Sequence, residues 1–311
     1  MRTHFDAIVI GAGPAGSTTA ILLAQAGWSV ALIEKGTFPR RKVCGECIAA
    51  TNLPLLDALG VGAVFAAIAG PQLRRVALWA GTRSVTAALP AFESTLHPWG
   101  RALGREHLDD MLLQRAAGVG AVIFQPCTAR CLGGGPGDFR CAIECSRPRS
   151  SMTLNAPVAI AAHGSPSASP RSGPLPRSRR PSTGLIAFKA NFIGARLEPG
   201  LLPVLSFRGG YGGMVVAEQD RATLACCVGR ERLRALRQNS PDAAAGVAVE
   251  AFLRRECAGV GAALDGATRV GAWLSTAPVQ PGIRLTTAGG GAFLVGNAAG
   301  EAHPLIGEGI G

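Results

Sequence analysis

Three glycines near the N-terminus follow a short apolar segment and precede an apolar stretch with helical character. The segment Asp6–Ile10 predicts a strand, and Pro14–Ala26 predicts a helix. Between them lies the turn Gly11-Ala12-Gly13-Pro14-Ala15-Gly16, and a second apolar strand is expected at 29–33. The chain therefore opens with a strand–helix–strand unit, whose apolar strands favour a parallel sheet covered on both faces.

The glycine spacing fits the chemistry of a dinucleotide pyrophosphate. Glycines at these positions allow a tight turn and let a phosphate approach the N–H groups at the start of the helix. Glu34 ends the second strand, where a carboxylate can accept hydrogen bonds from an adenosine ribose. The predicted cofactor residues of this region are Gly11, Gly13, Ala15, Gly16, Glu34 and Lys35. They do not separate FAD from NAD, because both cofactors carry this moiety.

A second glycine-rich turn near the end of the chain separates the two cofactors. A strand expected at 292–295 leads into Gly296-Asn297-Ala298-Ala299-Gly300-Glu301-Ala302-His303-Pro304-Leu305-Ile306-Gly307-Glu308-Gly309. This segment resembles the second FAD motif of the flavoprotein monooxygenase and geranylgeranyl reductase superfamily. The resemblance implies FAD as the cofactor, with contacts at Gly296, Asn297, Gly307 and Gly309. Asn297 stands where the family usually has Asp, and it keeps an acceptor oxygen but loses the charge.

Three further segments extend the resemblance over nearly the whole chain. Arg105 matches the arginine that opens a helix and contacts FAD in this superfamily, and a cation at a helix N-terminus opposes the macrodipole. The segment 161–165 resembles the family's DG motif, with His163 in place of the usual Asp. The segment 38–46 resembles a K-x-CGE segment that lies near the flavin in the reductases. This likeness makes Cys44 and Glu46 the candidate catalytic residues.

The resemblance implies an α/β fold in which a Rossmann-like FAD-binding domain of the p-hydroxybenzoate hydroxylase type contains an inserted β-rich substrate domain. We expect the FAD-binding domain at 1–75, 98–165 and 266–311, and the substrate domain at 76–97 and 180–265. The remaining residues, 166–182, are rich in Pro and Arg and predict a solvated loop.

The residue patterns add several elements to this outline. Apolar positions from Arg105 to Ala117 share one helical face. Ser240 as N-cap and Pro241 at the first helical position predict a helix that ends near Cys257. Short β-rich segments bounded by turns predict an antiparallel sheet. They lie at 185–192, 202–207, 213–217 and 223–228.

Composition narrows the partners and the location. The 31 Lys and Arg exceed the 20 Asp and Glu, but four of the arginines fall in the 166–182 loop, without the interleaved aromatic residues that nucleic-acid binding would favour. Nine irregularly spaced cysteines without a signal peptide predict reduced thiols and a cytoplasmic protein. No metal site is expected, since no His and Cys cluster has ligand spacing. A peripheral membrane contact and the oligomeric state stay open.

Four functions remain in competition. The favoured one is an FAD-dependent oxidoreductase that uses NAD(P)H and performs monooxygenase-like chemistry on an apolar small molecule, because 207–213 holds glycines where the reductases have bulky rings. The second is flavin-dependent reduction of an isoprenoid-type double bond. The third is a dithiol–disulfide oxidoreductase using Cys44 and Cys47. The fourth is a non-catalytic flavin-binding remnant, because family members normally continue beyond position 311 and we expect this chain to be C-terminally truncated.

Overall fold

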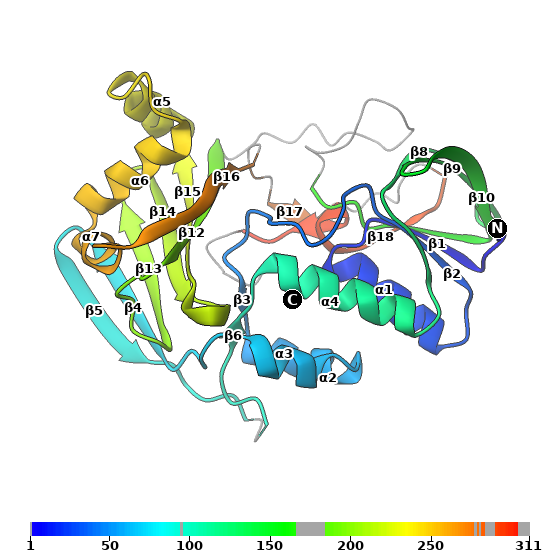
Figure 1. Cartoon of the computed structure of the whole chain (residues 1–311), viewed down its shortest axis with the longest axis horizontal. Helices are drawn as coiled ribbons and strands as arrows, with labels where there is room; N and C mark the ends of the chain where they lie inside the picture. Colours follow the sequence, from blue (N-terminus) through cyan, green and yellow to red (C-terminus); the bar gives the residue numbers. More distant parts are fainter. Residues whose placement is uncertain are drawn as a thin grey trace.

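The computed structural model describes residues 2–93, 96–165, 184–276, 279, 281–283 and 290–303. Two large sheets lie toward opposite ends of the long axis (Figure 1). Helix α4 (Arg105–Gly118) starts between them and runs toward the end that holds the five-stranded sheet (Figure 1). The Pro/Arg-rich loop expected at 166–182 lies outside the described residues.

The first sheet has five strands, all parallel, in the order β18-β11-β1-β2-β7. The strands are β1 (Ala7–Ile10), β2 (Val30–Ile33), β7 (Val122–Phe124), β11 (Val158–Ala161) and β18 (Phe293–Leu294). Its central strands, β1 and β2, are almost wholly buried, as a sheet covered on both faces requires. The expected α/β fold with a parallel Rossmann-like sheet is confirmed.

Two different layers cover this sheet. On one face, Val9 and Leu32 pack with a core that includes helix residues such as Leu108 and Leu112. The helices of this core are α1 (Pro14–Gln25), α2 (Leu53–Ala58), α3 (Gly62–Ile68) and α4, with the 3-10 turn η1 (Ala50–Asn52) before α2. On the other face, Ile8 packs in a core with the antiparallel strands β8 (Cys127–Gly135), β9 (Asp138–Ser146) and β10 (Arg149–Ala156).

The second sheet has seven strands in the order β16-β12-β15-β14-β13-β4-β5. These are β4 (Arg75–Ala80), β5 (Arg83–Ala88), β12 (Leu185–Ile193), β13 (Leu201–Phe207), β14 (Gly210–Val216), β15 (Ala222–Gly229) and β16 (Thr268–Ser275). All neighbours pair antiparallel except β4 and β13. The expected β-rich region is therefore present. Strand β16 pairs with β12 of this sheet, whereas residues from 266 onward were expected in the FAD-binding domain. The domain limits themselves stay a prediction.

Among the described residues, helices cover one face of the seven-stranded sheet, the face away from the first sheet (Figure 1). They are α5 (Arg230–Gln238), α6 (Ala245–Glu256) and α7 (Ala258–Ala263), and Phe188, Phe192 and Phe252 lie in the core between helices and sheet. Small pairs of strands lie between the two sheets. They are β3 (Cys47–Ile48) with β6 (Arg101–Ala102), and β17 (Gly282–Ile283) with β19 (Gly300–Glu301).

The helix expected to start at Ser240 is wrong in its start. Residues 240–244 form turns and a bend, and α6 begins only at Ala245. The first turn of α6 is packed tightly against β16, since a Cβ added to Gly246 would be 2.3 Å from Trp273 Cβ. Helix α5, just before these turns, was not predicted.

The expectation of reduced thiols is also wrong for one pair. Cys127 and Cys145, opposite one another on β8 and β9, form a disulfide. The other seven cysteines are free. Among the described helices, none is long and apolar enough to cross a membrane.

Candidate flavin site

Two glycines of the first turn are required by the protein's own packing. Gly11 has φ +106°, and an added Cβ would lie 2.4 Å from the carbonyl oxygen of Ala162 on the neighbouring strand segment. A Cβ on Gly16 would lie 1.8 Å from the carbonyl oxygen of Gly11. Glycine at these positions lets helix α1 start directly against the sheet.

Gly13 differs from both. Its φ of −70° suits any residue, and an added Cβ would meet nothing closer than Nη2 of Arg105, at 3.9 Å. No side chain caps helix α1, and no acidic residue lies in its first turn. The space beside Gly13 at an uncapped helix N-terminus suits a phosphate, so these residues fit the diphosphate of FAD.

Glu34 is held at the carboxyl end of β2 by three hydrogen bonds. Its carboxylate accepts the N–H groups of Ala12 (3.0 Å) and Gly36 (2.7 Å), and Nη2 of Arg40 lies 3.3 Å away. A carboxylate offers about four acceptor sites, so capacity remains for a ribose hydroxyl. Lys35, the next residue, is exposed.

Cationic side chains gather around the first glycine turn. Arg105 opens helix α4, and its Nε and Nη2 donate to Asp109 at 2.7 and 3.0 Å. Burial, together with the charges of Arg40 and Arg105, lowers the pKa of Lys42 to about 8. Burial and the like charges disfavour the ammonium form of Lys42, and a bound anion would favour it. This site therefore suits an anion.

The second glycine turn lies against the first. A Cβ on Gly296, at φ +58°, would be 2.6 Å from Cβ of Ala15. The 3-10 turn η4 (Gly296–Ala298) follows β18. The side-chain Nδ2 of Asn297 donates to Oγ of Ser165, in the DG-like segment, at 3.2 Å. The structure thus brings both predicted FAD motifs together. Gly307 and Gly309 lie outside the described residues.

Cys44 and Glu46 lie beside the start of helix α4. The N–H of Glu46 donates to Sγ of Cys44 at 3.3 Å, and Cys44 interacts with Arg105. Cys47 begins β3, and burial, followed by the proximity of Cys44 and Glu46, raises the pKa of its thiol to about 12. Both cysteines are free.

Glu46 is fully buried in a polar network that the sequence analysis missed. Its carboxylate accepts hydrogen bonds from Nζ of Lys189 and Oγ1 of Thr223, and from the N–H of Arg105 at 3.1 Å. Asn191 donates to Thr223 at 2.7 Å. The sequence does carry a signal for this network, because Lys189 and Asn191 are two residues apart in an otherwise apolar strand. The assignment of Glu46 as a catalytic residue stays a prediction.

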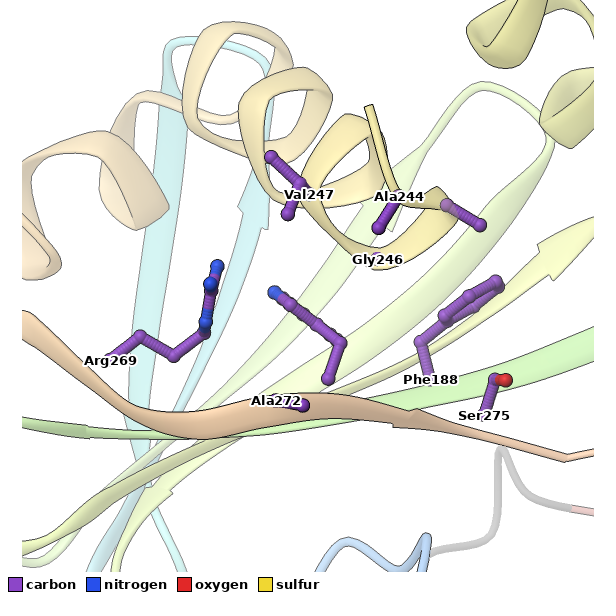
Figure 2. Close-up of a pocket in the computed structure, with 9 residues that line it drawn as sticks. Phe188, Ala244, Gly246, Val247, Arg269, Ala272 and Ser275 are labelled. Atoms are coloured by element: carbon purple, nitrogen blue, oxygen red, sulfur yellow. The ribbon is translucent and has the colours of Figure 1, made fainter. Parts of the chain in front are cut away.

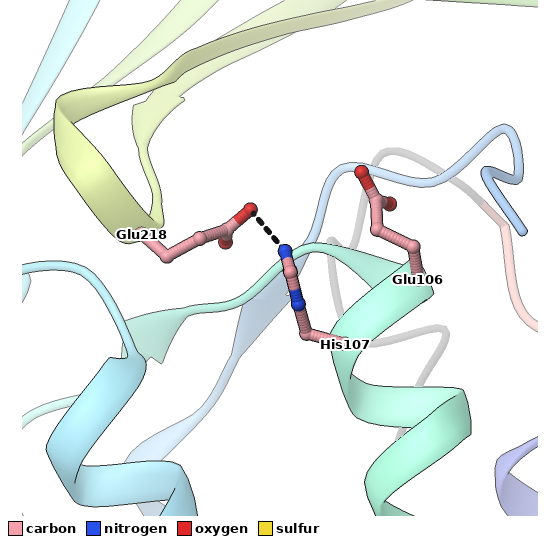
Figure 3. A group of neighbouring side chains, drawn as sticks. All are labelled: Glu106, His107 and Glu218. Atoms are coloured by element: carbon pink, nitrogen blue, oxygen red, sulfur yellow. Dashed lines mark ion pairs between the residues drawn. The ribbon is translucent and has the colours of Figure 1, made fainter. Parts of the chain in front are cut away.

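A second buried carboxylate also contacts the start of α4. Glu218, in the 3-10 turn η3 (Glu218–Asp220), accepts the N–H of Gly104 at 2.7 Å. Glu106, His107 and Glu218 bring potential metal-ligand atoms within 4.8 Å of one another (Figure 3). Arg221, however, donates to both carboxylates and offsets part of their charge. The cluster is therefore an ion-pair network that connects α4 to the seven-stranded sheet.

A pocket of about 280 Å³ lies elsewhere, between the start of α6 and strand β16 (Figure 2). Phe188, Trp273 and Arg269 line it together with small residues. Phe188 is next to Lys189 on β12 and faces the opposite side of the sheet. None of the predicted cofactor or catalytic residues lines this pocket.

Comparison with known proteins places this geometry in a family. The FAD binding domain family matches residues 4–310. The menaquinone reductase of Mycobacterium tuberculosis is 36% identical over 116 residues, which cover 37% of this chain and 28% of that protein. The chain thus aligns with less than a third of that relative's length.

Two solved structures share the fold. A myxobacterial FAD-dependent chondrochloren halogenase has a TM-score of 0.84 at 20% identity, covering 99% of this chain and 71% of that one. A geranylgeranyl bacteriochlorophyll reductase-like protein from Thermoplasma acidophilum has a TM-score of 0.72 at 19% identity, covering 99% of this chain and 75% of that one. The predicted likeness to the geranylgeranyl reductase superfamily is thus confirmed for the fold. With both glycine turns in place and the family match over almost its whole length, this chain belongs to the FAD binding domain family.

Proposed function

We propose that this chain is an FAD-dependent oxidoreductase that uses NAD(P)H and performs monooxygenase-like chemistry on an apolar small molecule. FAD, when bound, supplies the transfer of a hydride from the nicotinamide and the later reaction with oxygen or substrate. A nicotinamide co-substrate agrees with the expected cytoplasmic location.

The observation that supports an apolar substrate is a row of residues on the face of the seven-stranded sheet opposite α5, α6 and α7. Direct cross-strand neighbours share a face. From the outer edge inward, this apolar row consists of Val85, Leu78, Val204, Gly213 and Ala225, and Lys189 follows Ala225. Val85 is 70% exposed and Leu78 51% exposed, so this face has apolar surface to bury.

The position of Lys189 shows which way the apolar row faces. Its contact with Glu46 joins this face of the sheet to the start of α4, where Arg105 lies beside Gly13. The small residues Gly213 and Ala225 leave room next to Lys189. An apolar molecule on this row would therefore lie on the side of the sheet that faces the proposed flavin site, while α5, α6 and α7 fill the other side.

The protein's own residues have binding and orienting tasks in this proposal. The N–H groups at the start of α1 and the cations Lys42 and Arg105 hold the diphosphate. Glu34 holds the ribose, and Asn297 contacts the ribityl chain. The apolar row excludes water from the reacting partners, which strengthens the electrostatic interactions there.

Reduction of a double bond is the second candidate. The free thiol of Cys44 lies close to Arg105, where a proton donor to a reduced substrate would be needed. The similarity to a menaquinone reductase supports this candidate, because that protein's name describes a reduction.

The absorption spectrum of the purified protein, taken before and after NAD(P)H is added under nitrogen, tests the flavin assignment. Yellow colour that bleaches is expected, and a colourless protein that does not take up FAD contradicts it. Oxygen uptake during substrate turnover then separates the candidates. Full turnover under nitrogen, with a product that gains two hydrogens and no oxygen, would replace the monooxygenase proposal with the reductase.

A further inference from the structure

The loop Arg41–Glu46, here the 41–46 loop, is attached at both ends to the seven-stranded sheet. At its start, Arg41 donates to the side-chain oxygen of Asn191 and, at 2.9 Å, to the carbonyl oxygen of Val270. At its end, Glu46 accepts from Lys189 and Thr223. The predicted catalytic Cys44 lies between these attachments, although the loop follows strand β2 of the other sheet.

Lys189 places a charged group at a fully buried position of strand β12. Its neighbours Phe188 and Ala190 point into the helix-covered core, whereas Lys189 faces the other side and is fully buried there. Transfer of an ammonium group from water into the protein is costly unless a close, hydrogen-bonded counter-charge compensates it. The carboxylate of Glu46 is that counter-charge.

Glu46 transmits this contact to two parts of the proposed flavin site. Its side chain accepts the N–H of Arg105, its carbonyl oxygen accepts the N–H of Leu103 at 3.1 Å, and its own N–H contacts the sulfur of Cys44. The backbone of Glu46 has φ +65°, a conformation that is uncommon outside glycine and persists where surrounding contacts hold it.

We propose that Lys189 is a positioning residue: through Glu46 it sets where Cys44 and the first turn of α4 lie relative to the seven-stranded sheet. The consequence for flavin binding rests on the proposed function, because it assumes that Arg105 contacts FAD. The consequence for Cys44 does not, because the contacts between Lys189, Glu46 and Cys44 are made by the protein alone.

The test compares Lys189→Met with Arg254→Met. Arg254 pairs with Glu250 and contacts the carbonyl oxygen of Leu264 on the helix-covered side of the sheet, so its loss lowers stability without touching the 41–46 loop. In the flavin-free protein, the rate of iodoacetamide labelling of Cys44 is measured by peptide mass spectrometry at high pH. The exposed Cys131 of the same molecule is the internal reference.

Lys189→Met is expected to raise the labelling rate of Cys44 by about fivefold or more, as release of the loop makes local opening easier. FAD affinity should fall in the same variant. Arg254→Met should leave both unchanged. Labelling of Cys44 within about twofold of the parent rate in a folded Lys189→Met protein, or an equal rise in both variants, overturns the proposal.

If Lys189→Met does not fold, the double variant Glu46→Gln with Lys189→Met is measured by the same criteria, because it leaves no unpaired buried charge. Altered labelling of Cys44 with unchanged FAD affinity would keep the positioning role and contradict only the proposed flavin contact of Arg105.

Discussion

Nη2 of Arg105 lies 3.9 Å from the point where a Cβ on Gly13 would stand, and no other atom outside the adjoining residues is closer to that point. Gly11 and Gly16 are needed for the fold, as their missing Cβ atoms would collide with backbone. Gly13 is not, because its backbone angles are ordinary. Its glycine preserves a space whose purpose is best explained by a ligand.

Replacing Gly13 with Val should therefore remove FAD and preserve the fold. We expect FAD affinity to fall by about 100-fold or more, equivalent to about 3 kcal/mol, while the thermal midpoint of the flavin-free protein changes by only a few degrees. Flavin titration and thermal unfolding measure the two effects. Gly118→Ala, at the open end of α4, is the matched control and should change neither. Normal FAD binding by Gly13→Val would reject the site.

The pKa of Lys42 predicts a pH-dependent affinity for FAD. Burial, with the charges of Arg40 and Arg105, lowers this pKa to about 8. A bound diphosphate favours the charged ammonium, so affinity should fall as the pH rises from about 7 to 9, by up to about tenfold per pH unit. Lys42→Met should bind more weakly at pH 7 and lose most of this dependence. Lys35→Met, which changes an exposed lysine, should keep it.

The flavin-free protein should respond to pH in the opposite direction. Because the folded pKa of Lys42 lies below its ordinary value of 10.5, the unfolded chain binds more protons between about pH 8 and 10.5. The contribution of Lys42 to stability therefore rises with pH in this window. Urea unfolding of the parent and of Lys42→Met measures it, and a parent that shows no such relative gain would contradict the burial of the ammonium.

The first elements of the fold could be predicted from the sequence because each depends on residues close to it in the chain. The first strand, the glycine turn and helix α1 lie within 20 residues, and each carries its own signal. The start of α6 was misplaced because Ser240 and Pro241 are good capping residues in the sequence, whereas the helix begins at Ala245, where Gly246 packs against Trp273.

The network around Glu46 shows what sequence could not supply. Glu46 was singled out as a candidate catalytic residue, but its partner Lys189 is 143 positions away, on a strand of the seven-stranded sheet. A carboxylate's chemistry depends on such partners more than on its motif. The cofactor residues were easier to predict, because backbone geometry and small residues define the two glycine turns.

Cys47 should be dispensable for any reaction that the chain performs. Burial raises the pKa of its thiol to about 12, so only about one molecule in ten thousand would carry the thiolate at pH 8. Cys47→Ser is expected to leave the rate of flavin reduction within about twofold of the parent rate. A reversible Cys44–Cys47 disulfide in a thiol titration, together with loss of turnover in Cys47→Ser, would instead establish the dithiol–disulfide mechanism.

Arg221 should contribute to the free energy of unfolding at neutral pH, and this contribution should decrease at acid pH. It compensates Glu106 and Glu218, whose side chains are 10% and 5% exposed. Arg221→Met leaves both carboxylates buried without this partner, which should lower the free energy of unfolding at pH 7 by about 3 to 5 kcal/mol. Arg196→Met removes an ion pair whose side chains are 71% and 66% exposed, and should cost less than about 1 kcal/mol.

The pH dependence identifies the cause. Burial raises the pKa of Glu106, but the hydrogen bond and charge of Arg221 outweigh it, so the folded pKa lies below the ordinary 4.5. The stability that this pair contributes is therefore complete above pH 4.5 and is lost as the pH falls through the folded value. Arg221→Met removes the hydrogen bond and the charge that oppose burial most strongly, so Glu106 should become protonated more readily than in the parent. The difference in unfolding free energy between the two proteins should shrink from pH 7 to pH 4. A constant difference would mean that Arg221 acts through packing of its side chain and not through its charge.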